Sequence, residues 1–157
     1  MEDKIKTREE IRQIAEDLRR NAKRIVTTNG AFDILHVGHV RSLYAARQYG
    51  DCLIVGLNSD SSVRGYKGPN RPINNQADRA DFLSALECVD YVVIFDEPDP
   101  RELLRVIKPH YHVKSKSGFK GIEREVIESN GGQIVLLEDL PGYSTTNLLN
   151  RLLQGEG

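Results

Sequence analysis

The sequence predicts an α/β domain built on a five-stranded parallel sheet that is flanked by helices on both faces. Short apolar runs alternate with amphipathic segments along the chain, which is the order of βαβ units. Runs such as CLIVGL and YVVIF are almost wholly apolar, as expected for strands covered on both faces. A chain of 157 residues is long enough to bury one such core. We therefore predict that 1–157 forms a single Rossmann-like domain.

The individual elements follow from periodicity and from capping or turn residues. Residues 1–23 contain apolar positions at helical spacing after the capping signature TREE, which predicts an N-terminal surface helix. Segment 65–74, GYKGPNRPIN, is predicted to be a long irregular loop because it is rich in Gly, Pro and Asn. A terminal helix is predicted at 145–153, with a frayed tail at 154–157. Strands are expected at 24–28, 52–57, 91–95, 110–114 and 134–138, and further helices near 39–49, 77–86, 100–107 and 121–129.

The composition favours a globular protein with a small-molecule partner. A net charge of -1 gives no surplus of positive charge for nucleic acid or an anionic membrane. The N-terminal segment is too charged for a signal peptide, and no apolar run approaches a membrane span. We therefore expect no nucleic-acid or membrane partner and a cytoplasmic location. Cys52 and Cys88 lie in apolar segments without CxxC spacing, which predicts buried free thiols.

Two of the four histidines flank a glycine where the first strand passes into its helix. Residues three apart at a helix start share one face, so His36 and His39 can reach one ligand. The helix N-terminus favours an anion, and Gly38 lets a phosphate approach the backbone. A capping histidine beside a surface histidine, or a pair of metal ligands, explains the same spacing. From this pair alone, phosphate binding and those two alternatives stay open.

The longer stretch TNGAFDILHVGHVRSLYAARQYGD resembles the HxGH signature of the cytidylyltransferase-like nucleotidyltransferases. The resemblance implies that His36 and His39 bind the nucleotide's phosphates and stabilise the charge that develops at the α-phosphate. Such chemistry needs positioning and electrostatic stabilisation rather than a protein nucleophile. Asp33 fits a turn-forming or capping role better than a base, and we keep it as a candidate beside the acceptor. The same resemblance implies nucleotide contacts at Asn29, Gly30, Ala31, Phe32 and Gly38.

The stretch GLNSDSSVRGYKGPNRPI is similar to a pattern of the bacterial heptose-1-phosphate adenylyltransferases, one branch of that family. Charge alone would favour a solvated loop, although two cations on one loop also suit a triphosphate. The resemblance implies that Lys67 contacts the phosphates as a catalytic residue, with Asn58, Asp60 and Arg71 beside the nucleotide. Arg79 falls where the family has an arginine, which implies a nucleotide contact, and its alternative is an ordinary exposed helical arginine.

Near the C-terminus, PGYSTTNLL combines a turn, three hydroxyl side chains and a helix start. Hydroxyls and backbone N–H groups at a helix start form a second anion site. The segment resembles the family's GxSTT motif, which implies contacts with the β- and γ-phosphates. The residues concerned are Tyr143, Ser144, Thr145 and Thr146.

Two stretches depart from family patterns. The glycerol-3-phosphate branch has an Arg-Thr pair where this chain has Asp139 and Leu140, which favours the heptose branch. Heptose enzymes read VKGGDY after the fourth strand, whereas this chain reads VKSKSGF. Lys114 and Lys116 are candidates to face an anionic acceptor, with solvent as the alternative. His110 and His112 lack a neighbouring carboxylate or thiol, so we predict structural roles for them.

The sequence as a whole therefore predicts a nucleotidyltransferase that uses an NTP and a sugar 1-phosphate, with ATP and heptose 1-phosphate as first choice. Mg²⁺ is expected to enter with the NTP, and no protein metal ligand is predicted. A homodimer is the expected assembly. One alternative is a cytidylyltransferase that uses glycerol 3-phosphate, another polyol phosphate or a phosphonate. The other is a non-catalytic nucleotide-binding regulatory module.

Overall fold

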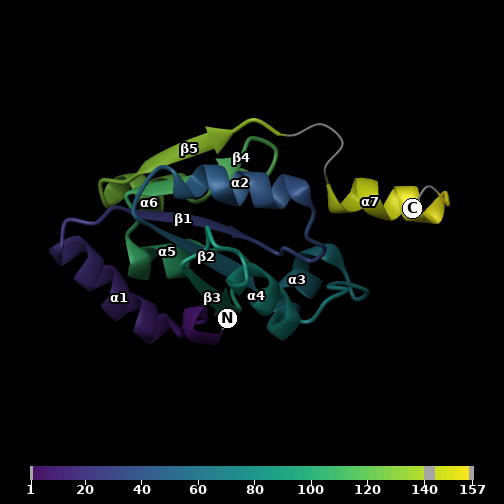
Figure 1. Ribbon diagram of the computed structural model, residues 1–157, viewed down its shortest axis with the longest axis horizontal. Coiled ribbons are helices and arrows are strands. Elements are labelled where there is room, and N and C mark those ends of the chain that lie inside the picture. The colour runs from purple at the N-terminus through teal and green to yellow at the C-terminus, as the bar shows by residue number, and fades with distance from the viewer. Residues whose placement is uncertain (1, 140–143, 156–157) are drawn as a thin grey trace.

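The computed structural model describes residues 2–139 and 144–155 (Figure 1). Five strands form one parallel sheet in the order β3-β2-β1-β4-β5, which confirms the predicted fold class. The strands are β1 (Ile25–Gly30), β2 (Cys52–Asn58), β3 (Tyr91–Phe95), β4 (Tyr111–Ser115) and β5 (Gln133–Leu137). The helices are η1 (Glu2–Lys4), α1 (Arg8–Arg20), α2 (Val37–Arg47), α3 (Asp60–Lys67), α4 (Gln76–Ser84), α5 (Arg101–Ile107), α6 (Arg124–Ser129) and α7 (Thr145–Leu153).

Helices cover both faces of the sheet. On one face, Leu43 of α2 and Leu83 of α4 pack on alternate residues of β1 and β2 such as Val55. On the other face, α1 and α5 pack on the intervening residues, with Ile11 and Ile54 fully buried. Figure 1 shows α1 and α2 on opposite sides of the strands. Because both faces are covered, β2 is buried at every position, which explains its unbroken apolar sequence.

The N-terminal helix begins at the predicted capping box. Thr7 accepts a hydrogen bond from the Glu10 N–H, and the Glu10 carboxylate accepts one from the Thr7 N–H. Just before it, Ile5 forms a bridge with Val92, and the Lys6 N–H donates to the Val92 carbonyl at 2.9 Å. The N-terminal segment therefore covers the edge of β3, which would otherwise expose unpaired backbone groups.

One predicted loop is shorter than expected, because its first residues belong to α3. Ser59 caps this helix by accepting from the Ser62 N–H, and Val63 anchors it in the core. The helix ends at Lys67, where Gly68 adopts a φ of 98° that glycine tolerates best. Lys67 was expected on an irregular loop and instead occupies the last turn of a helix.

Two further expectations concern the cysteines and the helices. Cys52 and Cys88 are buried and free, as predicted. None of the helices in the described ranges is long and apolar enough to cross a membrane.

The sheet opens between β1 and β4. β1 pairs with β2 at six successive positions, whereas its pairing with β4 is confined to Val26 with Tyr111 and Thr27 with His112. The strand order also reverses direction at β1, since β2 and β3 lie on one side of it and β4 and β5 on the other. Open α/β sheets bind ligands in the crevice at such a reversal, beyond the carboxyl ends of the strands.

Two histidines brace the sheet before this opening. The Ile25 N–H donates to His110 Nδ1 at 2.9 Å, and His112 Nδ1 lies 2.8 Å from Thr27 Oγ1. His112 is fully buried, and this burial lowers its pKa to about 3. Both residues therefore make internal contacts within the sheet, as the structural roles predicted for them require.

We predict that buried His112 makes the fold sensitive to acid. In the unfolded chain its pKa returns to about 6.5. Below that pH the unfolded state binds more protons than the folded state, so the free energy of unfolding falls as the pH falls toward about 3. Urea denaturation at several pH values gives the free energy of unfolding as a function of pH. Its slope should be shallower for His112→Gln than for wild type, by up to about 1.4 kcal/mol per pH unit. Parallel curves for the two proteins would contradict a neutral buried His112.

Candidate active site

Two adjoining cavities form one cleft at the opening between β1 and β4. Their volumes are about 240 and 310 Å³. They share four lining residues, which join the cavities: His39, Ser42, Lys67 and Ser115. The smaller cavity extends along Thr28–Ala31 toward Lys114, and the larger one extends toward α7. The cleft therefore occupies the position at which this architecture binds ligands.

The two signature histidines lie at the start of α2 with their rings together. His36 is the N-cap residue, and its Nδ1 accepts from the Gly38 N–H at 3.1 Å. His39 Nδ1 accepts from the His36 N–H at 3.3 Å, and the ring centroids are 3.9 Å apart. The expectation that both rings share one face is confirmed. Since each Nδ1 accepts a hydrogen bond, each neutral ring carries its proton on Nε2, where it can serve as a donor.

Both rings are neutral at pH 7 in the free protein. Burial lowers the pKa of His36, and burial together with the charges of His36 and Lys67 lowers the pKa of His39 to about 4. Lys67 supplies the nearby positive charge from the rim of the cleft, although burial and Arg71 lower its pKa. Two neutral N–H donors, a cation and a helix N-terminus form a site suited to a polyphosphate.

An unusual turn at Phe32 packs against the His39 ring. Phe32 has a φ of 47°, which non-glycine residues rarely adopt, and its ring centroid lies 5.5 Å from that of His39. A Cβ at Gly30 would approach the Phe32 ring to 3.1 Å, so a side chain there would push this ring by a few tenths of an ångström. Together with Asn29 and Ala31, these residues line the smaller cavity.

Asp33 anchors the loop that follows α3. Its side chain has no exposed surface, and it accepts hydrogen bonds from the Ile73 and Asn74 N–H groups and from Arg71 Nε, each about 2.9 Å long. Burial raises the pKa of Asp33, but these bonds outweigh burial and hold the pKa below its usual value. Arg71 is thus held on Asp33 and does not line the described cavities. This geometry agrees with the turn-anchoring role that the sequence favoured for Asp33.

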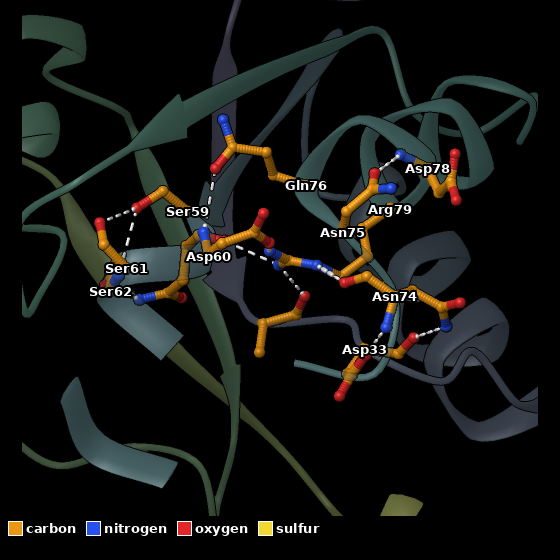
Figure 2. A network of polar contacts seen from close by, with 12 residues as sticks. Asp33, Ser59, Asp60, Ser61, Ser62, Asn74, Asn75, Gln76, Asp78 and Arg79 are labelled. Atoms are coloured by element: carbon orange, nitrogen blue, oxygen red, sulfur yellow. Dashed lines mark hydrogen bonds and ion pairs between the residues drawn. The ribbon is translucent and has the colours of Figure 1, made fainter. Parts of the chain in front are cut away.

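Arg79 joins three segments beneath the cleft (Figure 2). Its Nη1 donates to the carbonyls of Ala31 and Asn58, each at 2.7 Å, and its Nε donates to the Asn74 carbonyl at 2.9 Å. Its Nη2 pairs with Asp60 at 2.8 Å. Arg79 is fully buried, so the alternative of an exposed helical arginine is wrong. Periodicity suggested a surface position, and only folding brings these four acceptors around the guanidinium.

The two lysines after β4 separate. Lys114 lines the smaller cavity, and its ammonium donates to the Asn29 carbonyl at 2.7 Å. Burial lowers the pKa of Lys114 to about 8, although Glu123 partly opposes this shift. Lys116 instead pairs with Glu138 and lines neither described cavity. Of the two candidates for an anionic acceptor, only Lys114 is therefore placed to meet one.

Residues at the start of α7 line the larger cavity. Ser144 caps the helix by accepting from the Asn147 N–H at 3.0 Å, and Ser144 and Thr146 line the cavity with the histidines. Tyr143 lies outside the described residues, as does the side chain of Thr145. Sequence reasoning missed four residues that line the larger cavity, Ser42, Ser115, Ser117 and Asp139, although the last three fall in the stretches that depart from the family patterns. In the described ranges, no group of three or more His, Cys, Asp or Glu residues is arranged to hold a metal.

The open parallel sheet, with its histidine-glycine-histidine helix start at the reversal of strand order, defines a nucleotidyltransferase-type α/β domain. The chain belongs to the cytidylyltransferase-like family, whose sequence pattern matches residues 27–151.

Relatives with curated names extend this match to almost the whole chain. It is 46% identical over 152 residues to the Bifunctional protein HldE of Syntrophotalea carbinolica, covering 96% of this chain and 31% of that protein. It is 52% identical over 153 residues to the Bifunctional protein HldE of Aliarcobacter butzleri, covering 97% of this chain and 32% of that protein. The chain thus spans about a third of the length of these relatives.

Solved structures share the fold. The crystal structure of the lipopolysaccharide core biosynthesis protein from Thermoplasma volcanium superposes with a TM-score of 0.66 at 29% identity, covering 75% of this chain and 98% of that chain. The pantoate-beta-alanine ligase from Francisella tularensis gives a TM-score of 0.61 at 13% identity, covering 96% of this chain and 78% of that chain. The second likeness concerns the fold alone.

We predict that Arg79→Met destabilises the protein by about 3–5 kcal/mol, because Asp60 and buried carbonyls would lose their donor. Arg64→Met, at an exposed position of α3, is the matched control and should change stability by less than about 0.5 kcal/mol. Urea denaturation of both variants measures the difference. Equal, small effects would show that the Arg79 contacts contribute little.

Proposed function

We propose that this chain is a nucleotidyltransferase that transfers a nucleoside monophosphate from an NTP to a sugar 1-phosphate and releases pyrophosphate. ATP and heptose 1-phosphate are the proposed substrates. The observation that carries the proposal is the pair of Nε2 donors on His36 and His39, which share a cleft with Lys67 and with the α7 start. Similarity to the HldE proteins and to a lipopolysaccharide core biosynthesis protein supports the substrate class.

In the proposed reaction, the NTP lies with its triphosphate across the start of α2. His36 and His39 donate hydrogen bonds to the oxygens around the α-phosphate and Lys67 offsets their charge, while Ser144 and Thr146 hold the β- and γ-phosphates. An oxygen of the acceptor phosphate attacks the α-phosphorus in line, and the bond to the bridging oxygen of the β-phosphate breaks. Mg²⁺ would arrive with the NTP and would offset part of the charge on its phosphates. A phosphate monoester is largely dianionic at pH 7, so the attack needs no strong base.

The remaining predicted residues take two kinds of role in this proposal. Lys114 lies in the smaller cavity and would meet the acceptor. The resemblance implied nucleotide contacts for Asn29 to Phe32, but because they line the same cavity as Lys114, we assign them to the acceptor instead. The buried network of Asp33, Arg71, Arg79, Asn58 and Asp60 would position the loops around the ligands instead of contacting them. Lys116 is left out, because its ammonium is paired with Glu138 outside the cleft. Tyr143 and Thr145 keep their proposed place in the motif that holds the distal phosphates.

The proposal extends to the organisation of the protein. Residues 1–157 would act as one catalytic domain in the cytoplasm, and a homodimer is the proposed assembly. A cytidylyltransferase is the second candidate, because VKSKSGF replaces the heptose pattern beside the cleft. Only the nucleotide and acceptor would differ between these two enzymes.

A screen of the four NTPs against heptose 1-phosphate, glycerol 3-phosphate and other sugar phosphates tests the function. We expect pyrophosphate release to be fastest with ATP and heptose 1-phosphate. CTP with glycerol 3-phosphate as the best pair would establish the second candidate. No pyrophosphate from any pair, with NTP binding retained, would point to a regulatory module instead.

We predict that His36→Ala and His39→Ala each lower kcat by about 10²–10³-fold, because each removes one donor to the charge that develops. Tyr44→Ala is the control, since Tyr44 lies on the same helix, is 61% exposed and does not line the described cavities. Steady-state pyrophosphate release and circular dichroism should show a lost rate with a retained fold. Turnover near the wild-type value in both histidine variants would remove these residues from the mechanism.

A further inference from the structure

The two stretches that depart from the family patterns are joined to each other. Ser117, in the loop after β4, donates its N–H to Asp139 Oδ2 at 3.0 Å and its hydroxyl to Asp139 Oδ1. One residue earlier in each stretch, Lys116 pairs with Glu138, and the Lys116 N–H donates to the Leu137 carbonyl at 2.9 Å. These contacts fix the Asp139 carboxylate at the carboxyl ends of β4 and β5.

Asp139 lies in a cavity that otherwise suits an anion. It lines the larger cavity with His36, His39, Lys67 and Ser144. Hydrogen bonds from Ser117 hold the pKa of this carboxyl below its usual value, so it is ionised at pH 7. A carboxylate repels phosphate oxygens, and it therefore suits a part of the ligand that donates hydrogen bonds.

The chemistry of an NTP supplies such donors close to the triphosphate. The ribose lies next to the α-phosphate and carries two neighbouring hydroxyls. A carboxylate has about four lone-pair positions, and Ser117 uses one on each oxygen. Hydrogen bonding by the Ser115 side chain and by the Asp139 N–H also lowers the pKa of this carboxyl. A hydroxyl of the ligand would join these donors or replace one of them, and a charged acceptor makes such bonds stronger than a neutral one.

We propose that Asp139 recognises the ribose hydroxyls of the bound nucleotide and that Ser117 is a positioning residue that orients its carboxylate. This inference rests on the proposed function for the identity of the ligand. It assigns the larger cavity to the nucleoside and triphosphate, and it leaves the smaller cavity beside Lys114 to the acceptor.

Calorimetric binding of nucleotides in the absence of acceptor tests the proposal. Asp139→Ala should weaken ATP binding by about tenfold to a hundredfold, the range for a lost hydrogen bond to a charged group. At least one of 2′-deoxyATP and 3′-deoxyATP should bind wild type more weakly than ATP does. For that nucleotide, Asp139→Ala should lower the affinity by less than about a further threefold. Inorganic tripolyphosphate should bind both proteins equally well or bind the variant more tightly, because it lacks the ribose.

Three variants separate recognition from folding. Glu138→Ala is the matched control, since this neighbouring carboxylate joins the same two loops without lining the cleft, and it should bind ATP like wild type. Ser117→Ala should weaken ATP binding, and Ser117→Thr should restore it because the hydroxyl returns. If Asp139→Ala does not fold, Asp139→Asn and Ser117→Ala provide the same comparison.

The outcomes separate this inference from the proposed function. Equal losses for ATP, both deoxynucleotides and tripolyphosphate would overturn the inference, because Asp139 would then act on the phosphates, their Mg²⁺ or the order of the loop. Unchanged ATP binding in a folded Asp139→Ala would also overturn it. Absence of nucleotide binding in wild type would overturn both proposals. Nucleotide binding without turnover would contradict the proposed reaction only. The comparison of ATP with the deoxynucleotides would then still decide the role of Asp139.

Discussion

The cleft exists because β1 and β4 stop pairing at Thr27 and His112 while their other neighbours continue to the ends of the strands. Beyond that point β1 and β4 no longer pair, and the Lys114 ammonium donates a hydrogen bond to the Asn29 carbonyl. The side chain that satisfies the exposed backbone is therefore also the cation on the wall of the smaller cavity. The end of the pairing between β1 and β4 therefore also places a positive charge on the cavity wall.

Around this opening, buried charges hold the loops that carry the site. Asp33 accepts hydrogen bonds from backbone N–H groups of the loop after α3, and Arg79 donates hydrogen bonds to carbonyls at the ends of β1 and β2. Charges removed from water need several such bonds, so each group is stable only when the surrounding loops are correctly placed. The network thereby couples the turn beneath the histidines to the loop that follows Lys67.

The site carries a modest positive charge. His36 and His39 are neutral because burial disfavours their protonated forms, and positive charge comes from Lys67 and Lys114. A bound polyphosphate would favour protonation of both rings, so the positive charge of the site would increase when this anion binds. Asp139 adds a negative charge to the lining of the larger cavity, which therefore presents a carboxylate as well as donors to a ligand.

The sequence by itself determined the parallel sheet with two helical layers, because apolar periodicity and capping signals are local properties of the chain. It also predicted that His36 and His39 would share a face, since helical spacing alone dictates that arrangement. Tertiary structure decided which cations face the cleft. Lys114 and Lys116 look alike in sequence, yet only one meets the opening between β1 and β4. Arg79 and Asp139 likewise acquired their surroundings from segments distant in sequence, because hydrogen-bond partners of charged groups are set by the packing of whole elements.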